Sequence, residues 1–196
     1  DEDEYTFLGM GSNDKSIFNI DFDKLPVRLK PQFGEDTQRI IDTYRKTRPG
    51  ASAADLLVAI QSINMMGLGS IVIAERKTEQ KGAPAYLYNF GYKSDNKVTG
   101  RDYPMGTPHA MDISFKFNKE QPQKDGTPGT SYWGGSRPER FIASRNFAEL
   151  WTTFARTGKP SAKGAPEWPP YDLTERPVMR IDTKCEVIRN RYSEEL

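Results

Sequence analysis

The sequence is poor in residues that hold metals: it has one histidine, His109, and one cysteine, Cys185, among 196 residues. Without clustered ligand types at metal-binding spacing, a metal site is not expected. The run GMGSND lacks the third glycine and the Lys-Ser/Thr ending of phosphate-binding loops, so no cofactor is expected either. A lone cysteine cannot form a disulfide within the chain and leaves the compartment open.

The chain also lacks an excess of charge of either sign, since 28 Lys and Arg face 27 Asp and Glu for a net charge of +1. No long-range field therefore favours nucleic acid or an anionic membrane. No run approaches the ~18–20 consecutive apolar residues of a membrane span, and no signal-peptide pattern opens the chain. We expect a soluble chain with neither a nucleic-acid partner nor a membrane span.

The first half of the chain predicts one strand followed by helices. It begins without methionine on the acidic DEDE, as a piece of a longer protein would, and residues 5–11, YTFLGMG, predict a buried strand before a loop that carries Asp14. Residues 35–46 have one apolar face and predict an amphipathic helix. Ser52 and Asp55 have the spacing of a capping box at the start of a helix, and 69–80 predict a further helix.

The second half alternates between strand and helix patterns. Tyr86, Tyr88, Phe90 and Tyr92 stand at alternate positions, which predicts a strand at 85–92 with one aromatic face. A helix is expected from residue 144 to Gly158, and short strands are expected at 178–181 and 186–189. Strands separated by helices indicate the α/β class. Two long polar loops, 94–108 and 118–140, flank the segment of His109, and loops of that length are more often functional than idle.

His109 is the candidate for chemistry, because an imidazole carries protons in both directions near neutral pH. The alternative is a satisfied histidine without a catalytic role. Asp14 is the candidate carboxylate that would orient the imidazole, because it follows a predicted buried strand of an α/β fold; its alternative is a residue that closes an Asx-turn. The nucleophile elbow Gly-x-Ser-x-Gly does not occur in the sequence. Tyr132 and Trp133 would line a substrate pocket or pack beneath a loop.

Several segments together resemble the type-B carboxylesterase family, the α/β-hydrolases that include para-nitrobenzyl esterases and cholinesterases. GTPHAMDISFKF, which contains His109, resembles the segment around the catalytic histidine, and LGMGSNDKSIF, which contains Asp14, resembles the strand and loop that carry the acid. NFAELWTTFARTGKPSAKGAPEWPPYD followed by RPVMRID is similar to the C-terminal helix and tail of the family. The match covers nearly the whole chain and less than half of a typical family member.

The resemblance implies that residues 1–196 are the C-terminal portion of one α/β-hydrolase domain, the last strands of its central sheet with flanking helices. It divides the chain into a strand and acid loop at 1–18, a helical region at 35–80, a strand and histidine loop at 85–118, and a C-terminal helix and tail at 139–196. It implies that His109 is the base and Asp14 the acid of a catalytic triad, in the chain order of α/β-hydrolases. The family commonly has Glu-Gly where this sequence has Asp14 and Lys15.

The resemblance also implies a small-molecule ester substrate and a serine from elsewhere. The nucleophile elbow and the oxyanion hole would come from an N-terminal segment or a companion chain that carries Gly-x-Ser-x-Gly, in a serine carboxylic-ester hydrolase that forms an acyl-enzyme. One alternative is a catalytically inactive esterase-like module for binding or adhesion. Another is a small α/β binding domain that folds alone, which the apolar strand at the start of the chain argues against.

Overall fold

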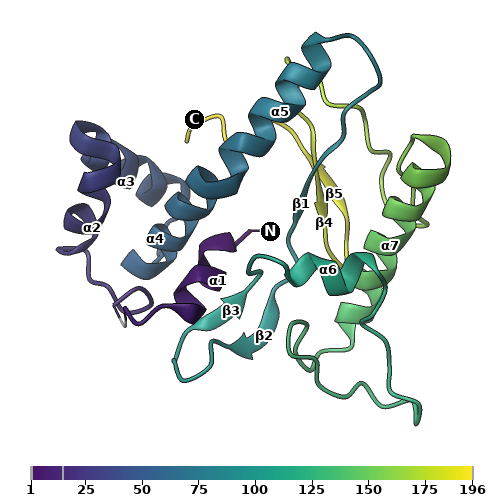
Figure 1. The fold of residues 1–196 in the computed structure, drawn as a ribbon, viewed down its shortest axis with the longest axis horizontal. Coiled ribbons are helices and arrows are strands. Elements are labelled where there is room, and N and C mark those ends of the chain that lie inside the picture. Colours follow the sequence, from purple (N-terminus) through teal and green to yellow (C-terminus); the bar gives the residue numbers. More distant parts are fainter. Residues whose placement is uncertain (1, 15, 196) are drawn as a thin grey trace.

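The computed structural model describes residues 2–14 and 16–195. In Figure 1, the helices α2 and α3 lie at one end of the molecule, α7 lies at the other, and the long helix of α4 and α5 runs between them. The elements, in chain order, are α1 (Glu4–Gly11), α2 (Leu25–Phe33), η1 (Gly34–Asp36), α3 (Thr37–Thr47), α4 (Ala53–Ser62), η2 (Ile63–Gly67), α5 (Leu68–Glu79), β1 (Leu87–Phe90), β2 (Ser94–Lys97), β3 (Pro104–Gly106), α6 (Met111–Lys116), α7 (Glu139–Thr157), β4 (Val178–Ile181) and β5 (Glu186–Ile188).

The predicted capping box starts α4. The Ser52 hydroxyl accepts a hydrogen bond from the Asp55 amide at 3.1 Å, and the Asp55 carboxylate accepts one from the Ser52 amide at 2.9 Å. Two orphan amides at the helix start are thereby satisfied. Beyond the cap, Leu56, Leu57 and Ile60 are buried in a core shared with α2 and α3. The helices predicted at 35–46 and 69–80 are confirmed as α3 and α5, with ends that differ by one or two residues.

The α4 and α5 helices are joined without a break through η2, one turn of π-helix. The combined helix, Ala53–Glu79, is long and apolar enough to cross a membrane by length and composition alone, and 39% of its most apolar window is buried. From the sequence we expected no membrane span, because the residues of α4 and α5 were interpreted as two separate helices. The core helix of a soluble protein meets the same criterion, and the α4 half occupies that position here.

The second core lies on a small mixed sheet. β1 runs parallel to β4, with Leu87 opposite Val178, and β4 runs antiparallel to β5. α6 and α7 pack on each other and against the sheet through the fully buried rings of Phe90, Phe115 and Phe147. The strands predicted at 85–92, 178–181 and 186–189 are confirmed, and so is the α/β class.

The strand predicted at 5–11 is wrong, because these residues form the helix α1. Thr6 and Gly9, three residues apart, face inward, and α1 packs against α4. A Cβ at position 9 would lie 2.5 Å from the Phe18 ring, so only glycine permits this approach. The Tyr5 amide donates to the Ser62 hydroxyl at 3.0 Å. A short apolar run fits a buried strand and a buried helix equally well, and the contact with α4 decides between them here.

Replacing Phe147 with alanine tests the second core. The ring is fully buried and lies 5.2 Å from the Phe90 ring, so Phe147→Ala should lower the free energy of unfolding by about 3–5 kcal/mol. Urea denaturation followed by circular dichroism measures the change. The control is Ile73→Ala, because Ile73 is 70% exposed and its loss should change stability by less than ~1 kcal/mol. Equal effects of the two substitutions would contradict this assignment of the core.

Glu2 makes the stability dependent on pH. Burial raises the pKa of this carboxyl, but hydrogen bonds and charge from Arg180 and Arg191 outweigh it, so the pKa lies below its ordinary value. A pKa lowered in the folded state stabilises the protein above the unfolded-state pKa of about 4.3 and loses this effect as pH falls. The unfolding free energies of the wild type and Glu2→Gln should therefore converge below that pH. A constant difference from pH 7 to pH 3 in urea titrations would refute the link.

Candidate active site

His109 lies on the short connection between β3 and α6. Two residues earlier, the fully buried Thr107 donates from its hydroxyl to the Tyr92 carbonyl at 2.8 Å, which ties the connection to the end of β1. One residue later, Ala110 has a left-handed backbone with φ of 69°, so the chain turns sharply into α6. The imidazole is held on a constrained turn, with 44% of its side chain exposed.

The partner of the imidazole is Glu4, from the first turn of α1. Nδ1 of His109 lies 3.0 Å from Oε2 of Glu4, whose side chain is only 11% exposed. A neutral imidazole that donates from Nδ1 to this carboxylate keeps Nε2 free to accept a proton. The ring of Phe7, one turn further along α1, stands edge-on to the imidazole at 5.8 Å between centroids. The arrangement is an imidazole held in one orientation by a buried carboxylate.

A cavity of about 420 Å³ opens beside this pair. His109 and Glu4 line it together with Asp112 and Lys77, and its apolar wall comes from α5, η2 and β1. Within it, the Tyr88 hydroxyl donates to Asp112 at 3.3 Å, and Lys116 donates to the same oxygen at 2.9 Å. Burial and the nearby Asp112 carboxylate raise the pKa of Tyr88. The aromatic alternation of the sequence located Tyr88 on its strand, but no pattern indicated its bond to Asp112.

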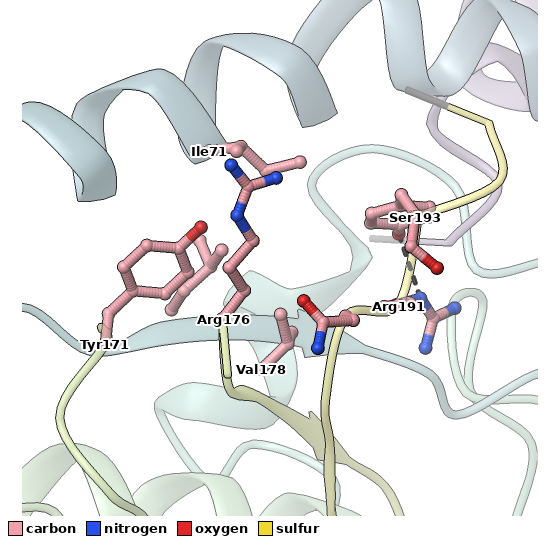
Figure 2. A pocket seen from close by; sticks show the side chains of 9 residues that line it. Ile71, Tyr171, Arg176, Val178, Arg191 and Ser193 are labelled. Atoms are coloured by element: carbon pink, nitrogen blue, oxygen red, sulfur yellow. Dashed lines mark hydrogen bonds between the residues drawn. The ribbon is translucent and has the colours of Figure 1, made fainter. Parts of the chain in front are cut away.

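A second cavity also borders Leu87 at the start of β1, and Figure 2 shows the arginines on its wall. Arg176 and Arg191 line it with Tyr171, Ile71 and Val178. None of its lining residues, as far as the chain is described, is a carboxylate or a histidine. Of these two cavities, only the first is lined by a histidine and a carboxylate in contact.

Asp14 lies apart from His109. Its Oδ1 accepts hydrogen bonds from the Ser16 amide at 2.9 Å and the Ser16 hydroxyl at 2.6 Å, and its other oxygen pairs with Arg28. The two bonds from Ser16, with Arg28, lower the pKa of Asp14 to about 2. The hydrogen bond from the Ser16 amide, two residues along the chain, closes an Asx-turn. This is the alternative role that the sequence left open for Asp14. Among the residues that the structure describes, the carboxylate bonded to His109 is Glu4, and the sequence carried no signal for that contact.

The loop 118–140 reaches the edge of the site through Trp133, whose ring lies 6.4 Å from the ring of Phe7. A buried ion pair holds this loop: Arg140 lies 3.3 Å from Glu120, and both side chains are nearly inaccessible. Glu120 also accepts from the Ser131 hydroxyl at 2.9 Å. Trp133 therefore packs against α1 beside the candidate site.

These features place the chain in a class before any comparison: a mixed α/β chain with an oriented histidine on the connection from the antiparallel β2–β3 pair to α6. The fold matches that of the carboxylesterase EST55 of Geobacillus stearothermophilus with a TM-score of 0.74 at 23% identity, over 99% of this chain and 38% of that one. A para-nitrobenzyl (PNB) esterase matches with a TM-score of 0.59 at 18% identity, over 98% and 35% of the two chains. The fold is thus that of part of an α/β-hydrolase.

The chain belongs to the carboxylesterase family, whose model matches residues 10–196. Among curated relatives, liver carboxylesterase B-1 of Rattus norvegicus is 30% identical over 82% of this chain and 25% of that protein. Carboxylesterase 1C of the same species is 30% identical over 69% and 23% of the two chains. The chain therefore spans about a quarter of the length of the curated relatives it matches.

The Arg140–Glu120 pair provides a test of how the loop is held. Arg140→Met leaves the Glu120 carboxylate buried without its cation, which should cost about 3–5 kcal/mol of unfolding free energy. Urea denaturation gives the value, and Arg140→Met with Glu120→Gln should recover part of the loss. As a control, Arg39→Met removes an exposed pair with Asp36 and should cost less than ~1 kcal/mol. A similarly small loss for Arg140→Met would show that this pair does not hold the loop.

Proposed function

We propose that this chain supplies the proton relay of a serine carboxylic-ester hydrolase, with His109 as the general base. The observation that carries the proposal is the 3.0 Å contact between Nδ1 of His109 and the buried carboxylate of Glu4, beside an open cavity in a chain of the carboxylesterase family. Nε2 of His109 takes the proton of the attacking serine and returns it to the leaving alcohol. Glu4 holds the imidazole in the required tautomer and stabilises the imidazolium.

Two carboxylates are candidates for the acid of the catalytic triad. Asp14 lies within the stretch matched by the family model, 10–196, and the sequence resemblance assigns it the role; this stays a prediction. Glu4 lies outside that stretch but touches the imidazole. We assign the role to Glu4, because a carboxylate orients a histidine only at hydrogen-bonding distance, about 2.6–3.2 Å.

The nucleophile and the oxyanion donors are assigned to polypeptide beyond these residues, as a further segment or a companion chain that carries Gly-x-Ser-x-Gly. Three observations support this part of the proposal. The motif does not occur in the sequence, the chain spans only 38% of EST55, and β1 pairs with a strand on one side only within the described residues. Exposed apolar side chains of α1, η2 and α5 lie at the cavity, as expected of a surface that further polypeptide covers: Phe7, Met66 and Ile73.

A fluorophosphonate probe on the native protein, isolated with any companion polypeptide, tests the proposal. Mass spectrometry should find the label on a serine within Gly-x-Ser-x-Gly, and hydrolysis of a para-nitrophenyl ester reports turnover. His109→Ala should lower kcat by roughly 10⁴-fold or more. Turnover by the 196 residues alone would contradict the external serine, and an unlabelled, inactive native protein would favour an esterase-like binding module.

A matched pair of variants distinguishes the two acids. Glu4→Gln should lower kcat by roughly 10²- to 10⁴-fold, because the imidazole loses the charge that stabilises its protonated form. Asp14→Asn should leave kcat unchanged, because its carboxylate faces Ser16 and Arg28. The reverse pattern would assign the acid to Asp14 and leave Glu4 without a role in turnover.

A further inference from the structure

Glu2, two positions before Glu4, is bound by two arginines from the C-terminal part of the chain. Oε1 of Glu2 accepts from Nε of Arg180 at 3.1 Å and from Nη2 of Arg191 at 2.7 Å. Arg180 lies on β4, and Arg191 follows β5. The Glu2 side chain is only 12% exposed, so this is a largely desolvated carboxylate between two cations. Arg191 also donates to the Tyr192 hydroxyl at 3.0 Å, the bond drawn in Figure 2.

Arg180 is itself fixed at the end of the sheet. Its Nη2 donates to the Gly91 carbonyl at 3.0 Å, and its Nη1 lies 3.1 Å from Asp182. A Cβ at position 91 would lie 2.5 Å from Nε of Arg180, so glycine at the end of β1 leaves the space that the guanidinium fills. The arginine therefore joins the sheet to the start of the chain through one side chain.

Asp3 makes the matching connection to the histidine loop. Its carboxylate accepts from the Thr107 amide at 3.0 Å, and its own amide donates to the Thr107 carbonyl at 3.1 Å. Thr107 stands two residues before His109, as Glu2 stands two residues before Glu4. The segment that leads into α1 is thus held to the sheet by Glu2 and to the histidine loop by Asp3.

We propose that Arg180 is a positioning residue for the Glu4–His109 pair. By holding Glu2, it fixes the start of α1 so that the Glu4 carboxylate meets Nδ1 of His109. The proposal rests on the proposed function, in which that contact orients the base. Arg180 does not touch the imidazole; it acts through the backbone from Glu2, its partner, past Asp3 to Glu4. A displacement of about 1 Å in such a pair is enough to impair proton transfer severely.

The single histidine makes the test direct, because ¹⁵N NMR of this 196-residue chain reports only one imidazole. At a pH roughly two units above 6.5 an ordinary imidazole is neutral, and its nitrogen shifts show which nitrogen carries the proton. The wild type should carry the proton mainly on Nδ1, where Glu4 accepts it. Glu4→Ala should move the proton to Nε2. Arg180→Gln should produce at least half of that change.

The companion variants separate positioning from loss of fold. Glu2→Ala removes this contact, together with the one to Arg191, without altering the sheet. It should change the tautomer at least as much as Arg180→Gln does, and Arg180→Gln added to Glu2→Ala should change it no further. Arg180→Lys should restore part of the Nδ1–H population. The control Arg176→Gln removes another ion pair, with Glu75 at 3.0 Å, and should leave the tautomer unchanged. Circular dichroism identifies variants that remain folded, and Glu2→Ala decides the question if Arg180→Gln unfolds.

Two failures are distinguishable. If Glu4→Ala leaves the tautomer unchanged, the proposed relay itself is wrong. If Glu4→Ala moves the proton but folded Arg180→Gln and Glu2→Ala do not, the relay stands and the positioning role of Arg180 is overturned.

Discussion

The carboxylate of Glu4 reaches the imidazole of His109 because the chain on either side of it is anchored to distant elements. Glu2 is bound by arginines of the C-terminal strands, Asp3 is bound to Thr107 of the histidine loop, and the Tyr5 amide is bound to Ser62 at the end of α4. Each contact joins residues far apart in the sequence. These contacts hold α1, a short helix with few inward-facing side chains, in a fixed place. The Glu4 carboxylate on this helix in turn holds the imidazole of His109 in one orientation.

The rest of the molecule is consistent with part of a larger sheet. The core of the second half is dense with aromatic rings, and its sheet has only three strands, with β1 at one edge among the residues described. The cavity of His109 opens where that edge meets α5, the less buried half of the long apolar helix. The half-exposed imidazole of His109 beside exposed apolar side chains supports the proposal that further polypeptide completes both the sheet and the chemistry.

Particular residues explain how far the sequence alone could be interpreted. The Ser52 and Asp55 capping box, the aromatic alternation of β1 and the helix that ends at Gly158 depend on neighbours within a few residues, and all three are confirmed. The π-helical turn that joins α4 to α5 and the conformation of residues 5–11 depend on packing, and the sequence analysis missed both. His109 was singled out as the one imidazole with a plausible setting. Its Glu4 contact has no local signature, because the two residues lie 105 positions apart.

The sequence by itself determined the α/β class, the family resemblance and the candidate base, because these follow from local periodicity, from motifs and from the presence of a single histidine. Only the tertiary structure decided that residues 5–11 form a helix, that Asp14 turns toward Ser16 and Arg28, and that Glu4 meets His109. The physical reason is that a carboxylate acquires its partner from what the fold brings within hydrogen-bonding distance. That distance is set by contacts among residues far apart in the chain, which no short stretch of sequence contains.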